Sequence, residues 1–220
     1  MDRKLARAIA LLIVLAVSAP FAVSAEISIG VKAGDWIEYQ VTFTGTPPEG
    51  HTVTWARMDV VSVQGKNVTV AVAAKQSDGS WLNETVRLNL EAGQLGDGFV
   101  IPANLSSGEI VFDKMHGDLT ISGVEERTYA GATRTIVAAT VNETAQQTTY
   151  QTTYYWDRAT GVLVEGDSSY TDFSMYTKMD RTNMWQAQTI GLELTAFYAL
   201  AIAVAAMLII IGFLVVRRRK

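Results

Sequence analysis

The feature that most constrains the fold of this chain is a series of short alternating segments, separated by turn signals, between residues 35 and 179. In "DWIEYQVTF" apolar residues alternate with polar ones, as a strand with one buried face requires: Ile37, Tyr39, Val41 and Phe43. Similar segments recur at spacings of about 8–12 residues, and Asp78-Gly79 is a strong hairpin signal. We therefore predict an all-β domain, an antiparallel curved sheet of about 8–10 strands that forms a half-barrel or barrel.

Two segments in this series are apolar at consecutive positions. "VTVAVAA" (68–74) and "TIVAAT" (135–140) present apolar side chains to both faces, which predicts central strands that are covered on two sides. Only "GEIVFDKMHG" (108–117) has a trace of helical periodicity beyond a turn or two.

The C-terminal end predicts a membrane span. From Thr195 to Val216 the chain carries no charge, and these 22 or so residues would form a helix of roughly 33 Å, enough for a bilayer core of about 30 Å. Residues 217–220, "RRRK", follow at once, and such a basic cluster stays in the cytoplasm. We therefore predict a transmembrane helix over 195–216, a cytoplasmic basic tail at 217–220 and a juxtamembrane linker over 183–194.

Small residues within this span suggest weak self-association. Two alanine pairs lie four residues apart, so that each pair shares one helix face: Ala199 with Ala203, and Ala201 with Ala205. Small faces let two helices approach closely, and we expect a weak homodimer through the transmembrane helix. Membrane lipid around that helix is the other expected partner.

The N-terminal end reads as a secretory signal peptide over residues 1–25. Basic residues precede an apolar stretch, Pro20 interrupts it, and Val23 and Ala25 suit cleavage after Ala25. The rival interpretation is an uncleaved anchor. With the signal peptide removed, we expect the region 26–182 to be an extracytoplasmic β-domain of a single-pass protein of the cell membrane, with the N-terminal domain outside and the C-terminus cytoplasmic.

The charge and cysteine content of this outer region exclude several functions. Residues 26–191 carry eleven Lys and Arg against twenty Asp and Glu, a net charge of −9, which argues against binding nucleic acid. The chain has no cysteine, so disulfides, thiol chemistry and thiolate metal sites are excluded.

Four of the asparagines begin an Asn-x-Ser/Thr sequon and are glycosylation candidates: Asn67, Asn83, Asn104 and Asn142. Asn83 is the best candidate because it lies near the Asp78-Gly79 turn, where we expect it to face solvent. Sequons on an exported, cysteine-free chain with a short basic tail are typical of an archaeal surface glycoprotein.

Residues that could support catalysis or bind a metal are few. His51 and His116 are the only histidines, and Asp113 with His116 makes one weak pair, too few ligands to close a tetrahedral zinc site. The two Ser…Lys pairs are spaced four apart on expected strands, too far apart for a dyad: Ser62 with Lys66, and Ser174 with Lys178. Phosphate loops and dinucleotide fingerprints are absent, and "GDSSY" lacks the strand-turn-helix elbow of a hydrolase. We predict no enzyme, no catalytic residue, no metal and no cofactor.

The segment "YYWDRATGVLVEGD" (154–167) looks the most like a reactive site, but we predict a hairpin turn. Asp157 would accept hydrogen bonds from the turn, so that its replacement by alanine costs about 1 kcal/mol. Gly161 would adopt the left-handed conformation that lets the chain return. Arg158 would be simply exposed, with an alanine substitution costing less than about 0.5 kcal/mol.

Three segments in this order across the outer domain carry a resemblance: "GDWIEYQV", "YAGATRTIVAA" and "YYWDRATGVLVE". They resemble a loose class of exported, β-rich surface proteins of bacteria and archaea, distantly similar to lipoprotein carriers built as curved antiparallel half-barrels. The resemblance implies a concavity that cradles acyl chains. The expected membrane span departs from those carriers, which are lipid-anchored or free, and hairpin motifs transfer no functional residue.

Two functions remain open from the sequence. The first is a single-pass cell-surface protein that presents a β-rich binding or structural module close to the membrane, with an envelope protein or glycan as partner. The alternative is a carrier or sensor of a hydrophobic ligand, a lipid, in the concavity of the curved sheet.

Overall fold

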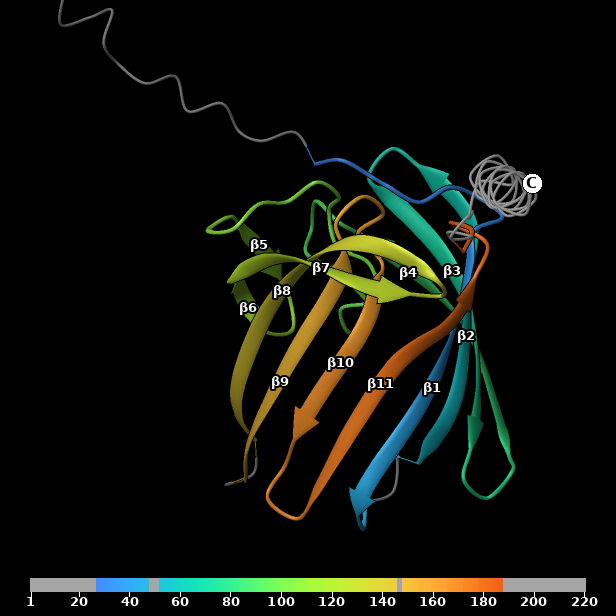
Figure 1. Ribbon diagram of the computed structural model, residues 1–220, viewed down its shortest axis with the longest axis vertical. Helices are drawn as coiled ribbons and strands as arrows, with labels where there is room; N and C mark the ends of the chain where they lie inside the picture. The colour runs from blue at the N-terminus through green and yellow to red at the C-terminus, as the bar shows by residue number, and fades with distance from the viewer. Residues whose placement is uncertain (1–26, 48–51, 146–147, 188–220) are drawn as a thin grey trace, which may run out of the picture.

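The computed structural model describes residues 27–47, 52–145 and 148–187, which contain eleven strands (Figure 1). The bounds of the strands are β1 Trp36–Gly45, β2 Val53–Gln64, β3 Asn67–Gln76, β4 Trp81–Asn89, β5 Ile110–Asp113, β6 Gly117–Thr120, β7 Gly123–Tyr129, β8 Ala132–Ala145, β9 Thr148–Asp157, β10 Leu163–Ser169 and β11 Phe173–Thr182.

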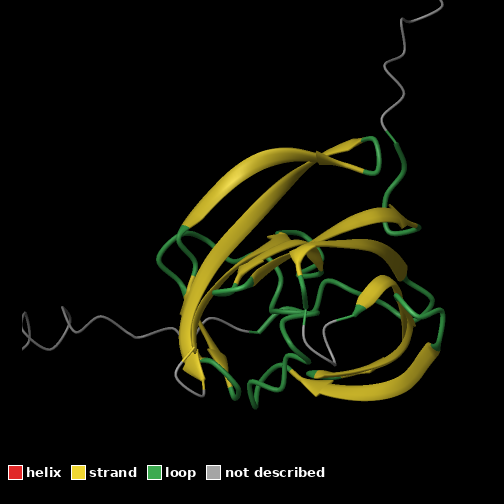
Figure 2. Ribbon diagram, turned by 90° about the horizontal axis from the view of Figure 1, so that it is seen from below, coloured by secondary structure: helices red, strands yellow, loops and turns green. Residues whose placement is uncertain are grey.

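Nine of these strands form one sheet in the order β4-β3-β2-β1-β11-β10-β9-β8-β7, and neighbouring strands are antiparallel. The predicted all-β, antiparallel fold of about 8–10 strands is confirmed at this level. Within the described residues the sheet is not closed, because β4 and β7 are its two edges. The strands curve, and loops lie within the curve (Figure 2). The pair β5–β6 forms a separate small sheet.

The alternation in β1 separates the two faces of the sheet. Ile37 and Tyr39 are buried on one side, which we call the core face, and their partners on β2, Met58 and Ala56, share it. Exposed Gln40 points to the opposite side, the outer face. Directly paired residues of antiparallel strands share a face, so the register carries this division across the whole sheet.

The long connection between β4 and β7, which contains β5 and β6, covers part of the core face. Its apolar side chains are buried in the same cluster as those of the sheet: Leu90, Leu95, Val100, Ile101, Val111, Leu119 and Ile121. Backbone hydrogen bonds fix it to the start of β10, since Leu163 N–H donates to Phe99 O at 3.0 Å and Ile101 N–H donates to Gly161 O at 2.9 Å. We call residues 90–121 the plug.

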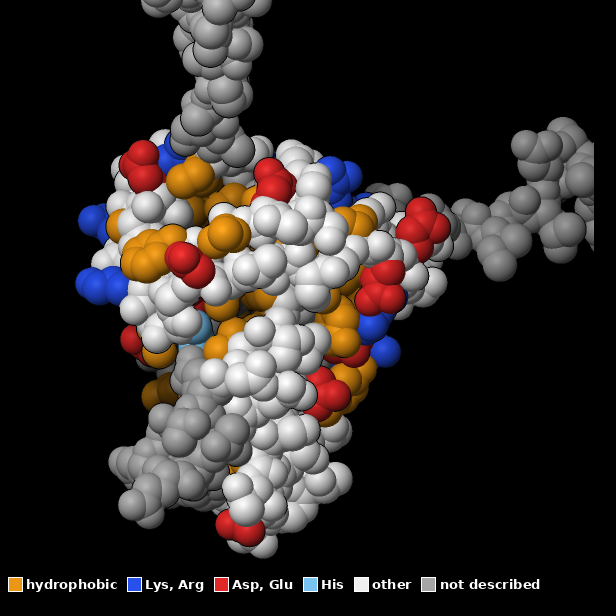
Figure 3. Space-filling model, turned by 90° about the vertical axis from the view of Figure 1, so that its left-hand side faces the viewer, with side chains coloured by type: hydrophobic (Ala, Val, Ile, Leu, Met, Phe, Trp, Pro, Cys, Tyr) orange, Lys and Arg blue, Asp and Glu red, His pale blue; other side chains and the backbone are white. Residues whose placement is uncertain are grey.

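The weak helical signal in residues 108–117 was misleading. This stretch is the β5–β6 hairpin, in which Val111 and Asp113 are buried while Ile110 and Phe112 are 62% and 54% exposed. A period of two is that of a strand. Hydrophobic side chains gather on the upper part of this side of the molecule, while the lower part is mostly polar (Figure 3).

The hairpin of β7 and β8 folds over the outer face of β9, β10 and β11 (Figure 1). Arg127 forms an ion pair with Glu165 on β10 at 3.1 Å, and the Tyr129 hydroxyl donates to Glu165 at 2.7 Å. Trp185, which follows β11, donates from its indole N–H to Tyr129 O at 3.1 Å, and Arg134 lies over its ring. The hairpin thus clasps the end of the domain from which the chain continues.

The two segments expected to be apolar on both faces differ. In β8, Ile136 and Val137 point to opposite faces and both are buried, as predicted. In β3 the core-face residues Val68 and Val70 are buried, but Ala71 and Ala73 are half-exposed on the outer face. The β3 segment (68–74) is therefore covered on one side only, unlike the prediction.

The described residues include no helix that is long and apolar enough to cross a membrane. The expected signal peptide over 1–25, and the expected span over 195–216 with its alanine pairs, lie outside the described residues.

Candidate functional site

The segment Tyr154–Asp167 is a turn between β9 and β10, as predicted. Asp157 is fully buried, and its Oδ1 accepts hydrogen bonds from Thr160 N–H at 2.9 Å and Thr160 Oγ1 at 2.8 Å. Gly161 has φ +73° and donates its N–H to Asp157 O at 2.7 Å. Asp157 and Gly161 therefore stabilise the turn, as expected.

One expectation for this turn was wrong. Arg158 is half-buried, and its guanidinium donates to Leu105 O at 2.6 Å and to Asn104 O and Ser106 Oγ at 3.3 Å each. The sequence could not show this, because the acceptors lie some fifty positions away, within the plug. Arg158 holds the plug against the β9–β10 turn.

We expect Arg158→Ala to lower the free energy of unfolding by about 1–2 kcal/mol, because three backbone or hydroxyl acceptors lose a charged donor while keeping partial access to water. Urea unfolding of the purified protein measures the change. Arg87→Ala, an exposed arginine on edge strand β4, is the control and should change stability by less than about 0.5 kcal/mol. Equal effects of the two substitutions would contradict the assignment.

Asp113 and His116 lie close together. His116 Nδ1 lies 2.7 Å from Asp113 Oδ2 in the β5–β6 turn, and both side chains are nearly buried. The ring of His116 also lies 6.2 Å from that of Tyr154. Across the described residues, three or more potential metal ligands come together nowhere. His51 lies outside the described residues.

In both serine–lysine pairs, the lysine contacts another group. Ser174 Oγ lies 2.7 Å from Thr44 Oγ1, and Lys178 lies over the ring of Tyr129, 5.8 Å from its centroid. Lys66 donates from Nζ to Ile27 O, while Ser62 belongs to β2.

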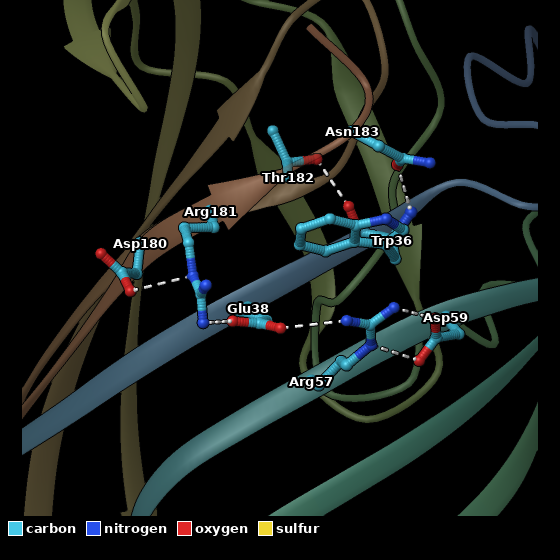
Figure 4. Close-up of polar contacts among 8 residues, drawn as sticks. All are labelled: Trp36, Glu38, Arg57, Asp59, Asp180, Arg181, Thr182 and Asn183. Carbon is cyan, nitrogen blue, oxygen red and sulfur yellow. Dashed lines mark hydrogen bonds and ion pairs between the residues drawn. The ribbon is translucent and has the colours of Figure 1, made fainter. Parts of the chain in front are cut away.

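An ion network crosses the outer face of β11, β1 and β2 (Figure 4). Glu38 is buried: one carboxylate oxygen accepts a hydrogen bond from Arg57 at 3.0 Å, and the other forms an ion pair with Arg181 at 2.6 Å without hydrogen-bond geometry. Arg57 also holds Asp59 at 2.8 Å, and the hydrogen bond to Asp59 raises the pKa of Arg57 above its ordinary value. Glu38 and Asp59 each have an arginine partner, and Arg181 also lies 3.6 Å from Asp180, so the network joins β11, β1 and β2.

A shallow hollow of about 220 Å³ lies beside this network on the outer face of β2, β3 and β4. Ala71 and Ala73 lie between Asp59 on β2 and the pair Asn83 and Thr85 on β4. Alanine at two successive outward positions of β3 leaves this space, because longer neighbours rise on both sides.

The half of the core face beyond the plug, which we call the distal half, is mostly apolar. Its residues come from β1, β8, β9, β10 and β11: Val41, Phe43, Ala139, Val141, Thr152, Tyr154, Gly166, Ser168, Phe173, Met175 and Thr177. Two of its hydroxyls share a hydrogen bond, Thr152 Oγ1 to Ser168 Oγ at 3.0 Å. Where β10 turns into β11, the ring of Tyr170 stacks on Tyr150 and Phe173, with centroids 5.1 and 4.1 Å apart.

Gly166 leaves room for a side chain in this half. The residue is buried, yet a Cβ placed on it would make a single ordinary van der Waals contact, with the Cβ of Thr177 at 3.9 Å. Protein interiors are normally close-packed, so a buried position with so few neighbours is unusual. The outer side of this half is polar, for example where Thr140 and Thr153 share a hydrogen bond.

The four sequon asparagines are all exposed. By register, three of them lie on strands and point to the outer face: Asn67, Asn83 and Asn142. Asn104 lies in the plug with φ +65°. The distal half of the core face therefore contains none of them.

Sequence reasoning found the sequons and the turn but missed the hollow and the space at Gly166. Both depend on which small residues come to lie side by side across strands. The only available signal was the cluster of small residues itself, in "AVAA" and "EGDSS".

Comparison with known proteins adds little. No protein-family model matches the chain, and no curated protein matches its sequence. Among solved structures it has a likeness to a crystal structure of the Mycobacterium tuberculosis lipoprotein LppX, with 10% identity and a TM-score of 0.34 over 72% of this chain and 89% of that one. At this level the likeness transfers no residue and no activity to this chain.

Proposed function

We propose that this is a single-pass cell-surface protein whose β-domain holds a hydrophobic ligand, a lipid acyl chain, along the distal half of its core face. The observation that carries the proposal is the sparse packing at buried Gly166, where an added Cβ would make one ordinary contact, on a mostly apolar face. Sites that bind apolar ligands are lined mostly by apolar side chains with a few polar groups.

The chemistry of the lining supports a chain-like, uncharged ligand portion. Phe43, Met175 and Tyr154 are half-exposed on the core face, and the nearby hydroxyls of Thr152 and Ser168 are satisfied by each other. Each methylene group transferred from water to such surroundings contributes roughly 0.8 kcal/mol. Methionine and aromatic side chains also adapt to ligands of varied shape.

The expected topology supports the same function. A span over 195–216 would leave only a short connection after Ala187, so the domain would lie close to the lipid surface. The sequons point away from the distal half, and glycans there would leave the core face accessible.

Gly166→Leu tests the ligand. Gly166 has ordinary backbone angles, and an added Cβ would make only one ordinary contact, with Thr177 Cβ at 3.9 Å, so leucine should be tolerated in the strand and should occupy the place of the ligand. The full-length protein is purified in detergent, exchanged extensively, and its bound lipid is extracted and quantified by mass spectrometry against protein. We expect at least about a tenfold loss of bound lipid, equivalent to 1.4 kcal/mol.

Gly123→Leu is the matched control, because Gly123 on edge strand β7 also has open space around it but lies away from Gly166. It should retain the lipid content of the unchanged protein. Unchanged protein without stoichiometric lipid, or a folded Gly166→Leu variant with undiminished lipid, would refute the carrier function.

A second candidate is contact with an envelope protein or glycan through the outer face. It is favoured by exposed apolar side chains on β2 and β4, namely Val61 and Trp81. Lipid-free protein that binds isolated envelope material would support this function in place of the first.

A further inference from the structure

The hollow on the outer face lies beside the sequon Asn83-Glu84-Thr85 on edge strand β4. Asn83 and Thr85, the two side chains that define the sequon, both line the hollow. They point to the same face because they are two residues apart on a strand. The question is what this space accommodates.

Trp81 lies on the same face, two residues before Asn83. At about 3.3 Å per residue, its position is roughly 7 Å from that of Asn83, within reach of a sugar ring attached to the asparagine. Trp81 is 57% exposed, and Trp55 on β2 contacts it edge to face with centroids 5.6 Å apart. One ring is thus held in place while much of its surface stays open.

The other sequons lack this arrangement. The amide of Asn67 donates to Gln64 O, and Asn142 Oδ1 accepts from Gln151 Nε2 at 2.8 Å. In the third sequon, Asn104 has a left-handed backbone and Ser106 accepts a hydrogen bond from Arg158. Asn83 combines an extended strand, a side chain without a described hydrogen bond, an aromatic neighbour and space.

We propose that Asn83 carries a glycan whose first sugar lies in this hollow, over Ala71 and Ala73, with the apolar face of the ring against Trp81. A pyranose has an apolar C–H face that packs on aromatic rings, and its hydroxyls find acceptors at the rim in Asp59 and Thr85. The small floor is what allows a ring to lie flat against the sheet.

The modification requires a donor, a sugar linked to a lipid phosphate, and a transferase of the cell surface. The Asn83 amide nitrogen forms a bond to the anomeric carbon of the sugar. The bond from that carbon to the phosphate oxygen breaks, and the lipid phosphate leaves with the electron pair. The amide proton passes to a base of the transferase. This inference shares with the proposed function only the extracytoplasmic location of the domain.

The site has a thermodynamic consequence for an edge strand. The first five residues of β4, Trp81–Thr85, are exposed, and such an edge is open to pairing with another chain. A sugar packed against Trp81 would bury apolar surface in the folded state only, and would therefore raise stability as well as shield the edge.

The test compares full-length protein from native cells with the same chain from a host that lacks N-glycosylation, both in detergent. Peptide mapping of the native material should show a glycan on Asn83. Asn83→Gln should lower the melting temperature of native-cell protein by about 2–4 °C. Trp81→Ala should give a similar decrease while the glycan remains attached. In the unglycosylated protein Asn83→Gln should have little effect, and Trp81→Ala should have a clearly smaller effect than in native-cell protein, namely the loss of its contact with Trp55.

Asn67→Gln serves as the matched control, since Asn67 is also exposed on the outer face but is hydrogen-bonded, and it should leave the melting temperature within about 1 °C. Unmodified Asn83 in native material would overturn the proposal. So would an equal effect of Trp81→Ala with and without glycan, because Trp81 would then act only through Trp55. Neither result bears on lipid at Gly166, so the two proposals fail separately.

Discussion

Gly161→Val should abolish folding, or lower the free energy of unfolding by at least about 4 kcal/mol. Gly161 has φ +73°, which a β-branched residue resists, and a Cβ would lie 2.1 Å from Ile101 O in the plug. The left-handed backbone alone would cost about 1–2 kcal/mol. The contact with the plug adds the larger part, because backbone has to move.

Circular dichroism and thermal melts of the purified variant measure this effect. Gly65→Val is the control for the backbone cost alone, since Gly65 has φ +59° but open space around it. Its loss should stay near about 1–2 kcal/mol. Similar losses of stability for the two variants would show that the plug backbone at Ile101 can move away from residue 161 at little cost, which would contradict this prediction.

Asp157→Ala should lower the free energy of unfolding by about 3 kcal/mol, three times what the turn hydrogen bonds alone predict. Besides the bonds from Thr160, Asp157 Oδ2 accepts Arg134 Nε at 2.7 Å and Oδ1 accepts Arg134 NH2 at 3.1 Å. Removing the buried carboxylate leaves these donors unpaired. The estimate stays below the cost of a fully buried pair because the Arg134 side chain keeps about a quarter of its surface exposed.

A double-mutant cycle separates the two contributions to this loss. The combined Asp157→Ala and Arg134→Ala variant should lose clearly less than the sum of the single losses, because the first substitution already removes the pair. Chemical unfolding of the four proteins gives the coupling energy. If the losses of the two single variants simply added in the double variant, a direct interaction would be contradicted. A loss of only about 1 kcal/mol for Asp157→Ala would mean that Asp157 contributes the turn hydrogen bonds alone.

The strands were predictable because their determinants are local. The alternation in β1, the Asp78-Gly79 turn and the Gly161 turn each depend on neighbours in the sequence, and all three form as predicted. In residues 108–117 the spacing of the apolar side chains was compatible with a helix or a strand. The segment forms strands because β5 pairs with β6. Tertiary contact settled what the local pattern left open.

The functional features were not predictable for the opposite reason. Arg158 reaches acceptors in the plug, and the hollow requires β2, β3 and β4 to be in register. Space over Gly166 exists only because β11 opposes it with Thr177. The small residues can be read from the sequence. Whether neighbouring side chains fill the space beside them depends on how the strands pair.

The contacts after β11 have a mechanical consequence. Asn183 accepts from Trp36 N–H and donates to Gly34 O, each at 2.8 Å, while Trp185 bonds to Tyr129 in the β7–β8 hairpin. A pull applied through the following segment would therefore load β1 and the hairpin together with β11. Tension shared among three elements has to break several contacts at once, whereas a strand gripped alone would peel away one residue pair at a time.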